Sequence, residues 1–290
     1  MTGGIAVDDE RPFIERMSGA ILLSDFAADP WYNMAADEML LAEASRDRES
    51  VYLRLYTWLP GAITFGYNQI VERAVDLRRL GETPLIRRVT GGRALFHDTS
   101  ELTYAIAFNA TGDLADVLGR SLSDTQSRLA HVLIEFLRSE GIDSEYSRAP
   151  DTRERRRAFV QSAPCFASTG RFELISRHRK VAASAQRRIQ GAVLQHGALK
   201  IAGPPAHPAL PLDPAIVLGD RPSPMAANSF RDHVDTFARA FSRVTGLPIR
   251  RRGYSEFELE MIHEWLDTVR KKSTERRDIF KHGPLHFSLS

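Results

Sequence analysis

The sequence contains a single cysteine, Cys165, among 290 residues. One cysteine cannot form a disulfide within the chain, and it leaves too few thiolates for a cysteine-rich zinc site. No apolar run approaches the roughly 18 residues of a transmembrane helix, and residues 1–17 lack the continuous apolar core of a secretory signal. We therefore expect a cytoplasmic protein that has no membrane partner.

An excess of positive charge is also missing. The chain has 39 lysines and arginines against 37 aspartates and glutamates, a formal net charge of +2. Proteins that coat nucleic acids carry a marked basic excess, so we expect no nucleic-acid partner. With 43% hydrophobic and 26% charged residues, the composition is that of a folded globular protein. The length allows one α/β domain with tails.

Hydrophobic periodicity predicts both strands and helices. Alternation with period two is clearest over 101–108, whereas residues 129–137 repeat apolar side chains at helical spacing. Strands are expected over 51–58, 62–67, 85–89, 101–108, 172–175, 180–186 and 192–201, and helices over 30–44, 123–140, 230–244 and from 255 onward. Several strands are joined by short turns, which favours an α+β fold with a mixed, largely antiparallel sheet flanked by helices.

Capping patterns mark the helix ends. Ser123 with Gln126, and Ser255 with Glu258, have the spacing of a capping box. Gly141 stands where a left-handed residue is expected to end the helix. The remaining segments are expected to be a lead-in over 1–19, an arginine-rich loop over 148–157, a proline-rich linker over 203–224 and a loose charged tail from 271.

The first candidate site is a pair of glycines, Gly91 and Gly92, directly after an expected strand. Glycine lets the backbone turn sharply and approach a ligand with no Cβ in the way. Arg88 and Arg93 flank the pair and could bind a phosphate or a carboxylate. The alternative is a hairpin turn with solvated arginines, and the Gly-Lys-Ser/Thr ending of a Walker phosphate loop is missing.

Cys165 is the second candidate, because it lies in an expected loop, Ser162–Ser168, where a core-filling thiol is out of place. A nucleophilic cysteine needs a lowered pKa, and a neighbouring cation lowers it by favouring the thiolate. Lys180 begins the next expected strand and can supply that cation, while His97 and His196 are alternative bases. The competing interpretation is a small cysteine buried in the core.

Small side chains dominate the third candidate, the strand that begins at Lys180. Residues 182–185, Ala-Ala-Ser-Ala, leave room over the strand for something bulky. Close packing under a helix explains the same pattern, and Lys180 is then a solvated strand end rather than a functional amine.

In this order the three segments resemble the lipoate/biotin protein ligase superfamily. Within it they most resemble octanoyl-[acyl carrier protein]:protein N-octanoyltransferases of the lipoate-ligase-like type. The matching blocks are Tyr32–Glu38, Arg87–Asp98 with Glu101–Tyr104, Pro164–Phe166 and Lys180–Gly197. Their order and separations make the match specific over residues 30–200.

The resemblance implies a two-step acyl transfer. Cys165 matches the family's nucleophile, which accepts an octanoyl group from octanoyl-acyl carrier protein as a thioester, and Lys180 matches the lysine that lowers its pKa. The acceptor is then a lysine of a lipoyl domain, such as the glycine cleavage H protein or a 2-oxoacid dehydrogenase E2. No ATP, metal or other cofactor is implied. The residues implied to bind the acyl substrate are Arg88, Gly91, Gly92, Arg93, His97, Ser184, Ala185, His196 and Gly197.

The same resemblance implies a fold like the catalytic domain of biotin and lipoate protein ligases. It predicts a catalytic domain over 20–250, with a C-terminal helix and tail over 251–290 packed on it. Two features depart from the family. Ala183 stands where a glycine is usual, so its methyl group narrows the backbone approach to the acyl pocket. Residues 153–157 are rich in arginine, which suits docking of acidic carrier or lipoyl domains or is a solvated loop.

Three other functions share parts of this pattern. An ATP-dependent lipoate–protein ligase has the same fold and a lysine like Lys180, but such ligases usually carry a third glycine at the position of Arg93 and need no cysteine. An amidotransferase that moves octanoyl groups between lipoyl domains uses the same cysteine chemistry. A catalytically silent carrier-domain binder is disfavoured by the presence of both Cys165 and Lys180.

Overall fold

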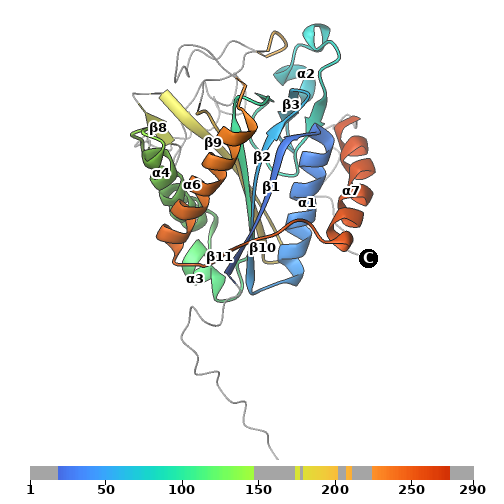
Figure 1. Ribbon diagram of the computed structural model, residues 1–290. Helices are drawn as coiled ribbons and strands as arrows, with labels where there is room; N and C mark the ends of the chain where they lie inside the picture. The colour runs from blue at the N-terminus through green and yellow to red at the C-terminus, as the bar shows by residue number, and fades with distance from the viewer. Residues whose placement is uncertain (1–18, 147–173, 177–178, 202–206, 211–223, 275–290) are drawn as a thin grey trace, which may run out of the picture.

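Figure 1 shows the computed structural model, which describes residues 19–146, 174–176, 179–201, 207–210 and 224–274. Cys165, the arginine-rich residues 153–157 and most of the expected linker lie outside these ranges. Within them the chain forms a large sheet, a small sheet and helices that cover both faces of the large sheet.

Eight strands form the large sheet. Their order is β11 (Ile249–Arg251), β1 (Gly19–Ala28), β2 (Ser50–Trp58), β6 (Leu102–Asn109), β10 (Ala192–Leu199), β9 (Arg179–Ile189), β8 (Leu174–Ser176) and β7 (Glu145–Tyr146). β1 runs parallel to both β11 and β2, and every later pair is antiparallel. This mixed, largely antiparallel sheet flanked by helices confirms the expected fold class.

A small sheet lies beyond the end of β2, at the top of Figure 1. Its order is β4 (Leu85–Arg87), β3 (Ala62–Phe65) and β5 (Leu95–His97), with β3 parallel to β4 and antiparallel to β5. Two short helical turns, α2 (Val71–Ala74) and η2 (Leu77–Arg79), connect β3 to β4. The glycine pair at 91–92 therefore lies in the connection between β4 and β5.

The helices divide between the two faces of the large sheet (Figure 1). One face is covered by α3 (Leu114–Leu118), α4 (Leu122–Ser139) and α6 (Ala227–Thr245). The other face is covered by α1 (Pro30–Arg46) and α7 (Glu256–Thr274), which pack against each other. Each face has its own hydrophobic core, and the sheet separates the two.

Helix α4 shows how the amphipathic pattern becomes packing. Its apolar residues at 129, 132, 133, 136 and 137 are all buried against the sheet and α6, as the helical spacing predicts. The predicted cap at Ser123 is wrong, because the Oγ atom that accepts from the Asp124 backbone N–H, at 3.1 Å, belongs to Ser121. The helix therefore begins at Leu122, while Gly141 does adopt the expected left-handed conformation, with φ of +76°.

The second predicted capping box is confirmed at the start of α7. The Glu258 backbone N–H donates to Ser255 Oγ at 3.2 Å, and the Ser255 backbone N–H donates to Glu258 Oε2 at 2.7 Å. The prediction of a loose tail from 271 is wrong for its first four residues, because α7 continues to Thr274. Lys272 in that last turn is only 8% exposed, and its ammonium group lies over the Trp265 ring and donates to a carboxylate on α1.

Candidate functional site

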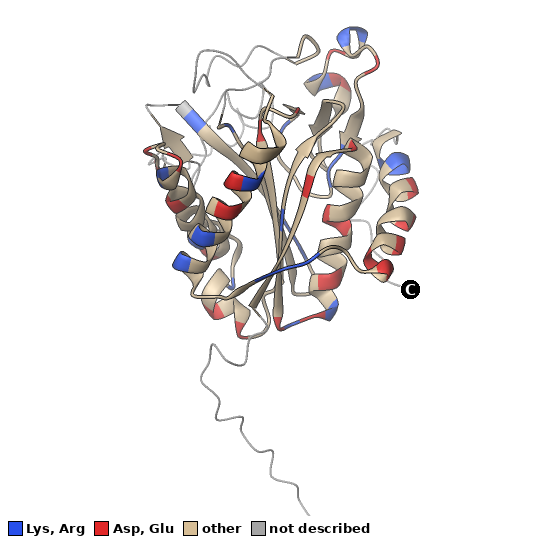
Figure 2. Ribbon diagram, in the orientation of Figure 1, with Lys and Arg blue, Asp and Glu red and all other residues tan. Residues whose placement is uncertain are grey.

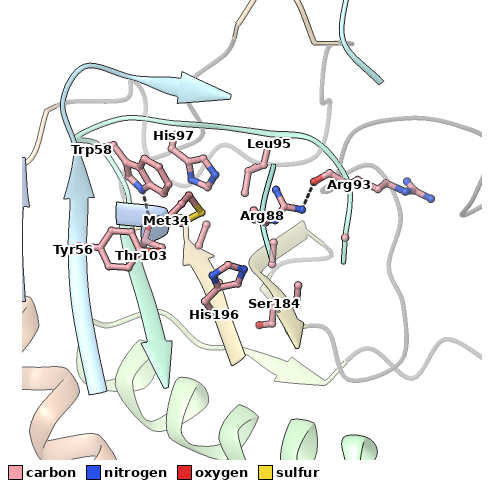
Figure 3. Close-up of a pocket in the computed structure, with 15 residues that line it drawn as sticks. Met34, Tyr56, Trp58, Arg88, Arg93, Leu95, His97, Thr103, Ser184 and His196 are labelled. Carbon is pink, nitrogen blue, oxygen red and sulfur yellow. Dashed lines mark hydrogen bonds between the residues drawn. The ribbon is translucent and has the colours of Figure 1, made fainter. Parts of the chain in front are cut away.

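The described residues line a cavity where the large sheet meets the small one (Figure 3). The lining residues are Met34, Tyr56, Trp58, Arg88, Gly92, Arg93, Leu95, His97, Thr103, Ala183, Ser184, Ala185, His196, Gly197 and Ala198. They come from α1, β2, β5, β6, β9, β10 and the glycine segment, so the fold gathers a site from distant parts of the chain.

The cavity has an open end and a closed end. Gly92 and Ser184 are exposed and lie at the mouth. Met34, Trp58 and His97 are buried, and together with Tyr56 and Thr103 they form the closed end. In Figure 3 the Met34 sulfur points between the Trp58 and His97 rings on one side and Arg88 on the other. The lining is therefore mostly apolar and aromatic, although the buried side chains of Arg88, Arg93 and His196 also belong to it.

Polar groups at the closed end are occupied by the protein itself. Trp58 Nε1 donates to Thr103 Oγ1 at 2.8 Å (Figure 3), and Tyr56 OH donates to Asp37 Oδ2 at 2.8 Å. The Trp58 ring stacks on the His97 ring with a centroid separation of 4.2 Å. A buried polar group that already has a partner does not demand one from a ligand, so this end suits an apolar chain.

His97 is held at both ring nitrogens. Its Nδ1 bonds to the buried carboxylate of Glu101, which also pairs with Lys200 Nζ. Its Nε2 lies 2.7 Å from Thr64 Oγ1. Burial lowers the pKa of His97 well below its usual range, and the nearby charges of Lys200 and Arg88 lower it further. The ring is therefore neutral, with Nδ1–H donating to Glu101 and Nε2 accepting from Thr64.

His196 is held in a similar way from the other side of the cavity. Its Nδ1 donates to Asp37 Oδ2 at 2.7 Å, and its Nε2 lies 2.6 Å from Thr90 Oγ1. Both histidines are predicted from the sequence to lie in the substrate site, and both line the cavity. Each nitrogen already has a partner, so the geometry favours a positioning role over that of a free base.

Arg88 shapes the glycine segment from within. Its Nη2 donates to the carbonyl oxygens of Gly91 at 3.0 Å and Arg93 at 2.9 Å, and its Nη1 donates to Thr64 Oγ1 at 2.6 Å. Figure 3 shows the bond to Arg93. The guanidinium thus binds backbone carbonyls rather than standing in solvent, and it fixes the turn in which Gly92 has a φ of +91°.

Two further glycines allow this close packing. A Cβ on Gly66 would meet the Gly92 carbonyl oxygen at 2.1 Å, and a Cβ on Gly197 would meet the Ala183 carbonyl oxygen at 2.3 Å. Either contact is too short for real atoms, so any larger residue would push the glycine segment or β9 out of place. Sequence reasoning missed Gly66, because no local pattern shows that it lies under Gly92.

Lys180 lies on β9 and is 3% exposed, so it is not a solvated strand end. Strand alternation breaks beside it, because β9 pairs with β8 through a register shift in which Ala182 is opposite Leu174 and Lys180 is opposite Ile175. Leu174 and Ala182 pack in the core under α4 and α6. The bulge therefore turns Lys180 to the opposite face, the face on which Ala183 lines the cavity.

The remaining predicted site residues fall in two groups. Gly91 contributes its carbonyl to the Arg88 bond, but neither Gly91 nor Lys180 is among the residues that line the cavity, whereas Ala185 and Gly197 are. Cys165 lies outside the described residues. Over the part of the chain that the structure covers, no cluster of three or more histidine, cysteine or acidic side chains could hold a metal ion. No described helix combines the length and apolar character needed to span a bilayer.

Comparison with known families gives one match over most of these elements. The model of the lipoyl protein ligase A/B catalytic domain matches residues 29–207. The chain is 35% identical over 175 residues to octanoyltransferase LipM of Staphylococcus aureus and 37% identical over 180 residues to octanoyltransferase LipM of Moorella thermoacetica. These alignments cover 59% and 61% of this chain, and they span 62% and 63% of the relatives' length.

Solved structures share the fold at lower identity. Protein Ta0514 of T. acidophilum with bound lipoic acid superposes with a TM-score of 0.69 at 20% identity, over 89% of this chain and 99% of that one. A lipoate-protein ligase A bound with ATP superposes with a TM-score of 0.67 at 20% identity, over 89% and 97%. These similarities extend the shared fold to the helices on both faces of the large sheet.

Proposed function

This chain belongs to the lipoyl protein ligase A/B catalytic domain family, and from that premise we propose that it is an octanoyltransferase of lipoate biosynthesis. The octanoyl group comes from octanoyl-acyl carrier protein and passes through a thioester on Cys165 to a lysine of a lipoyl domain. The similarity to octanoyltransferases named LipM supports the acyl group. The apolar cavity with its closed aromatic end is the observation that carries the proposal.

The closed end of the cavity suits the methyl end of a medium acyl chain. Burying about seven CH₂ and CH₃ groups at roughly 0.8 kcal/mol each contributes on the order of 5 kcal/mol to binding. Trp58, His97 and Met34 offer contact surface there, and the polar atoms of the two rings are already bonded within the protein. A neutral hydrocarbon is therefore accepted at little desolvation cost, whereas a buried carboxylate would find no free partner among these groups.

The reaction balances without ATP. The Cys165 thiolate attacks the thioester carbonyl of the donor, a new C–S bond forms, and the donor thiolate leaves and takes up a proton. The amine of the lipoyl-domain lysine then attacks the Cys165 thioester, forms an amide and releases the cysteine. The first step exchanges one thioester for another, and the second converts a thioester into the more stable amide.

Lys180 supports both steps in this scheme. An ammonium group beside Cys165 favours the thiolate over the thiol, and it can then stabilise the negative charge that develops on the thioester carbonyl oxygen. The bulge in β9 supports this role, because it turns a buried lysine to the face of the cavity. Gly92, exposed at the mouth, lets a carbonyl group come close to the backbone.

The acceptor is a protein with a lipoyl domain, for example a glycine cleavage H protein or a 2-oxoacid dehydrogenase E2. The amine must reach a thioester at the mouth of the cavity while the acyl chain stays in its closed end. That geometry favours an acceptor lysine on an exposed turn of a small domain. We also propose that the arginines of 153–157, which lie outside the described residues, attract the acidic carrier or lipoyl domain to the mouth of the cavity.

Intact mass spectrometry tests the proposal directly. Incubation with octanoyl-acyl carrier protein should add one octanoyl group to the chain without ATP, and Cys165→Ala should abolish the addition. Lys180→Ala should slow both the addition and the alkylation of Cys165 at neutral pH, with Lys271→Ala as the control for loss of one lysine. Transfer of lipoate to a lipoyl domain that requires ATP and survives Cys165→Ala would instead establish a lipoate–protein ligase.

A further inference from the structure

The last turn of α7 is bound directly to the strand that leads into the glycine segment. Arg87, the final residue of β4, is 2% exposed. Its Nε donates to the Lys272 carbonyl oxygen at 3.0 Å, and its backbone N–H donates to Ser273 Oγ at 2.9 Å. The last carbonyls of a helix lack partners within the helix and attract positive charge, so Arg87 acts as a cap for α7.

The same guanidinium also binds the connection that follows β3. Its Nη1 donates to the carbonyl oxygens of Tyr67 at 3.0 Å and Gln69 at 3.1 Å, and its Cζ lies over the Phe65 ring, 4.4 Å from the centroid. Arg87 therefore joins β3, β4 and α7 at one buried point. Removing it would leave carbonyl groups of two separate segments without their donor.

Lys272 forms a second bond from α7, to helix α1. Its Nζ donates to Glu38 Oε2 on α1 at 2.5 Å and lies over the Trp265 ring, 5.1 Å from the centroid. Glu38 follows Asp37, whose carboxylate binds His196 and Tyr56 at the wall of the cavity. The C-terminal helix thus contacts the support of the cavity from two directions.

The contacts of Arg87 are directly adjacent in sequence to the cavity wall, which begins with Arg88. Arg88 follows Arg87, and its backbone N–H donates to the Phe65 carbonyl oxygen at 2.9 Å. The Thr90 carbonyl oxygen accepts from the Tyr67 backbone N–H at 2.8 Å. Residues 88–93 are thus held by backbone bonds to residues 65–67 and by the bonds from the Arg88 side chain to its own segment. Because the segment is connected so tightly to β4, a shift of β4 relative to α7 moves the cavity wall.

We propose that Arg87 and Lys272 are positioning residues through which the C-terminal helix α7 sets the geometry of the glycine segment, residues 88–93. In this arrangement α7 supports the wall of the acyl site without lining it, although the helix lies beyond the residues 29–207 that match the family model. The structural part of this inference stands on the contacts alone. Its consequence for acyl loading rests on the proposed function.

Hydrogen exchange tests the structural part without any activity. The variants are Lys272→Met, which removes the ion pair but keeps an unbranched side chain, and Arg87→Gln, which removes the guanidinium. Backbone amides of residues 88–93 are expected to exchange about tenfold faster in both variants, the ratio that corresponds to about 1.4 kcal/mol of local opening. Lys272→Arg should restore slow exchange, because it keeps a cation beside Glu38.

The matched control is Arg252→Gln at the other end of α7. Arg252 forms a two-bond pair with Glu258, at 2.5 and 2.6 Å, far along the helix from Arg87. This variant should destabilise α7 yet leave exchange of residues 88–93 unchanged. Unchanged exchange in Lys272→Met, or equal acceleration in Arg252→Gln, would overturn the inference. If Arg87→Gln does not fold, the comparison of Lys272→Met with Lys272→Arg decides it.

Acyl loading provides a second readout that a merely structural role would not move. Lys272→Met should raise KM for octanoyl-acyl carrier protein at least fivefold with a smaller change in kcat, because the cavity wall moves while the reacting groups remain. Arg252→Gln should leave both constants as in the unsubstituted chain. If that chain itself takes no octanoyl group, the proposed function fails and the exchange result alone decides the role of α7.

Discussion

The two faces of the large sheet bury different kinds of side chain. The face under α4 and α6 is a hydrocarbon core of leucines, valines and phenylalanines. The face under α1 and α7 buries charged and polar groups among its apolar residues, including Arg54, Asp37 and Glu38 (Figure 2 shows where charged residues lie on each helix). The cavity opens on this second face, so the hydrocarbon face contributes to stability alone, whereas the polar face contributes to both stability and ligand binding.

The polar face is held together by one dense group of contacts around Arg54, which is fully buried. Its guanidinium binds Asp25 Oδ2 at 2.7 Å, Asp37 Oδ1 at 3.1 Å and Asn33 Oδ1 at 2.6 Å. Buried ions cost desolvation energy that only well-made pairs offset. These bonds fix the orientation of each side chain. Asp37 is held by Arg54 and in turn binds His196 Nδ1, so the orientation of the His196 ring depends on the same group of contacts.

The largest effect is expected from Asp37→Ala on the polar face. The change removes one buried partner from each of Arg54, Tyr56 and His196, which should cost about 3–5 kcal/mol of unfolding free energy. The folded fraction should also load octanoyl groups about 100-fold more slowly, because His196 and the glycine segment lose their alignment. Urea unfolding and acyl loading measure the two effects, and Asp37→Asn, which keeps one acceptor, should show smaller losses in both.

Leu133→Ala makes the opposite test on the hydrocarbon face. Leu133 on α4 is buried among the leucines and phenylalanines of that core, so its truncation should cost about 2–5 kcal/mol. Acyl loading per folded molecule should stay unchanged, because no group of the cavity depends on this side chain. If loading falls along with stability, the sheet does not separate the two faces as we infer.

The buried His97 should make the unfolding free energy of the chain fall in acid. Burial and the charges of Lys200 and Arg88 hold the pKa of His97 well below its usual value in the folded chain. In the unfolded chain His97 binds a proton near pH 6.5, whereas in the folded chain it stays neutral at that pH. His97 therefore contributes full stability above that pH and loses it as the pH falls. Between about pH 7 and pH 5.5 the loss should reach about 1 kcal/mol.

His97→Gln isolates this contribution. The variant lacks the titrating ring, so its unfolding free energy should depend less on pH over the same interval than that of the unsubstituted chain. Urea unfolding at the two pH values gives the comparison. An unchanged slope in His97→Gln would mean that His97 is not the group that couples acid to unfolding.

Sequence periodicity predicts the helices on both faces of the large sheet, but it misses two of the strands. Helices α4 and α6 each bury one stripe, which a single sequence displays clearly. Strand β1 was not predicted, because its residues 20–23 are buried on both faces and form a plain apolar run instead of an alternating one. Strand β11 has three residues, two of them exposed arginines, so no hydrophobic signal marks it.

The same contrast applies to the candidate site. Its glycines, histidines and small strand residues can be named from the sequence, because local motifs carry them. Gly66, Trp58 and Asp37 take their roles from partners on other elements, and no local pattern reports such pairings. The helix α1 likewise shows almost no polar face, since Asn33, Asp37 and Glu38 are buried with the rest.

The smallest effect is expected at the start of α7, far from the turn that Arg87 contacts. Ser255→Ala removes the oxygen that accepts from the Glu258 backbone N–H, and the loss of an N-terminal cap costs about 1 kcal/mol. Urea unfolding should detect this loss while acyl loading stays unchanged, because the last turn of α7 keeps its own contacts. Equal loss of loading in Ser255→Ala and Lys272→Met would mean that the site depends on the overall stability of α7, since the two substitutions lie at opposite ends of the same helix.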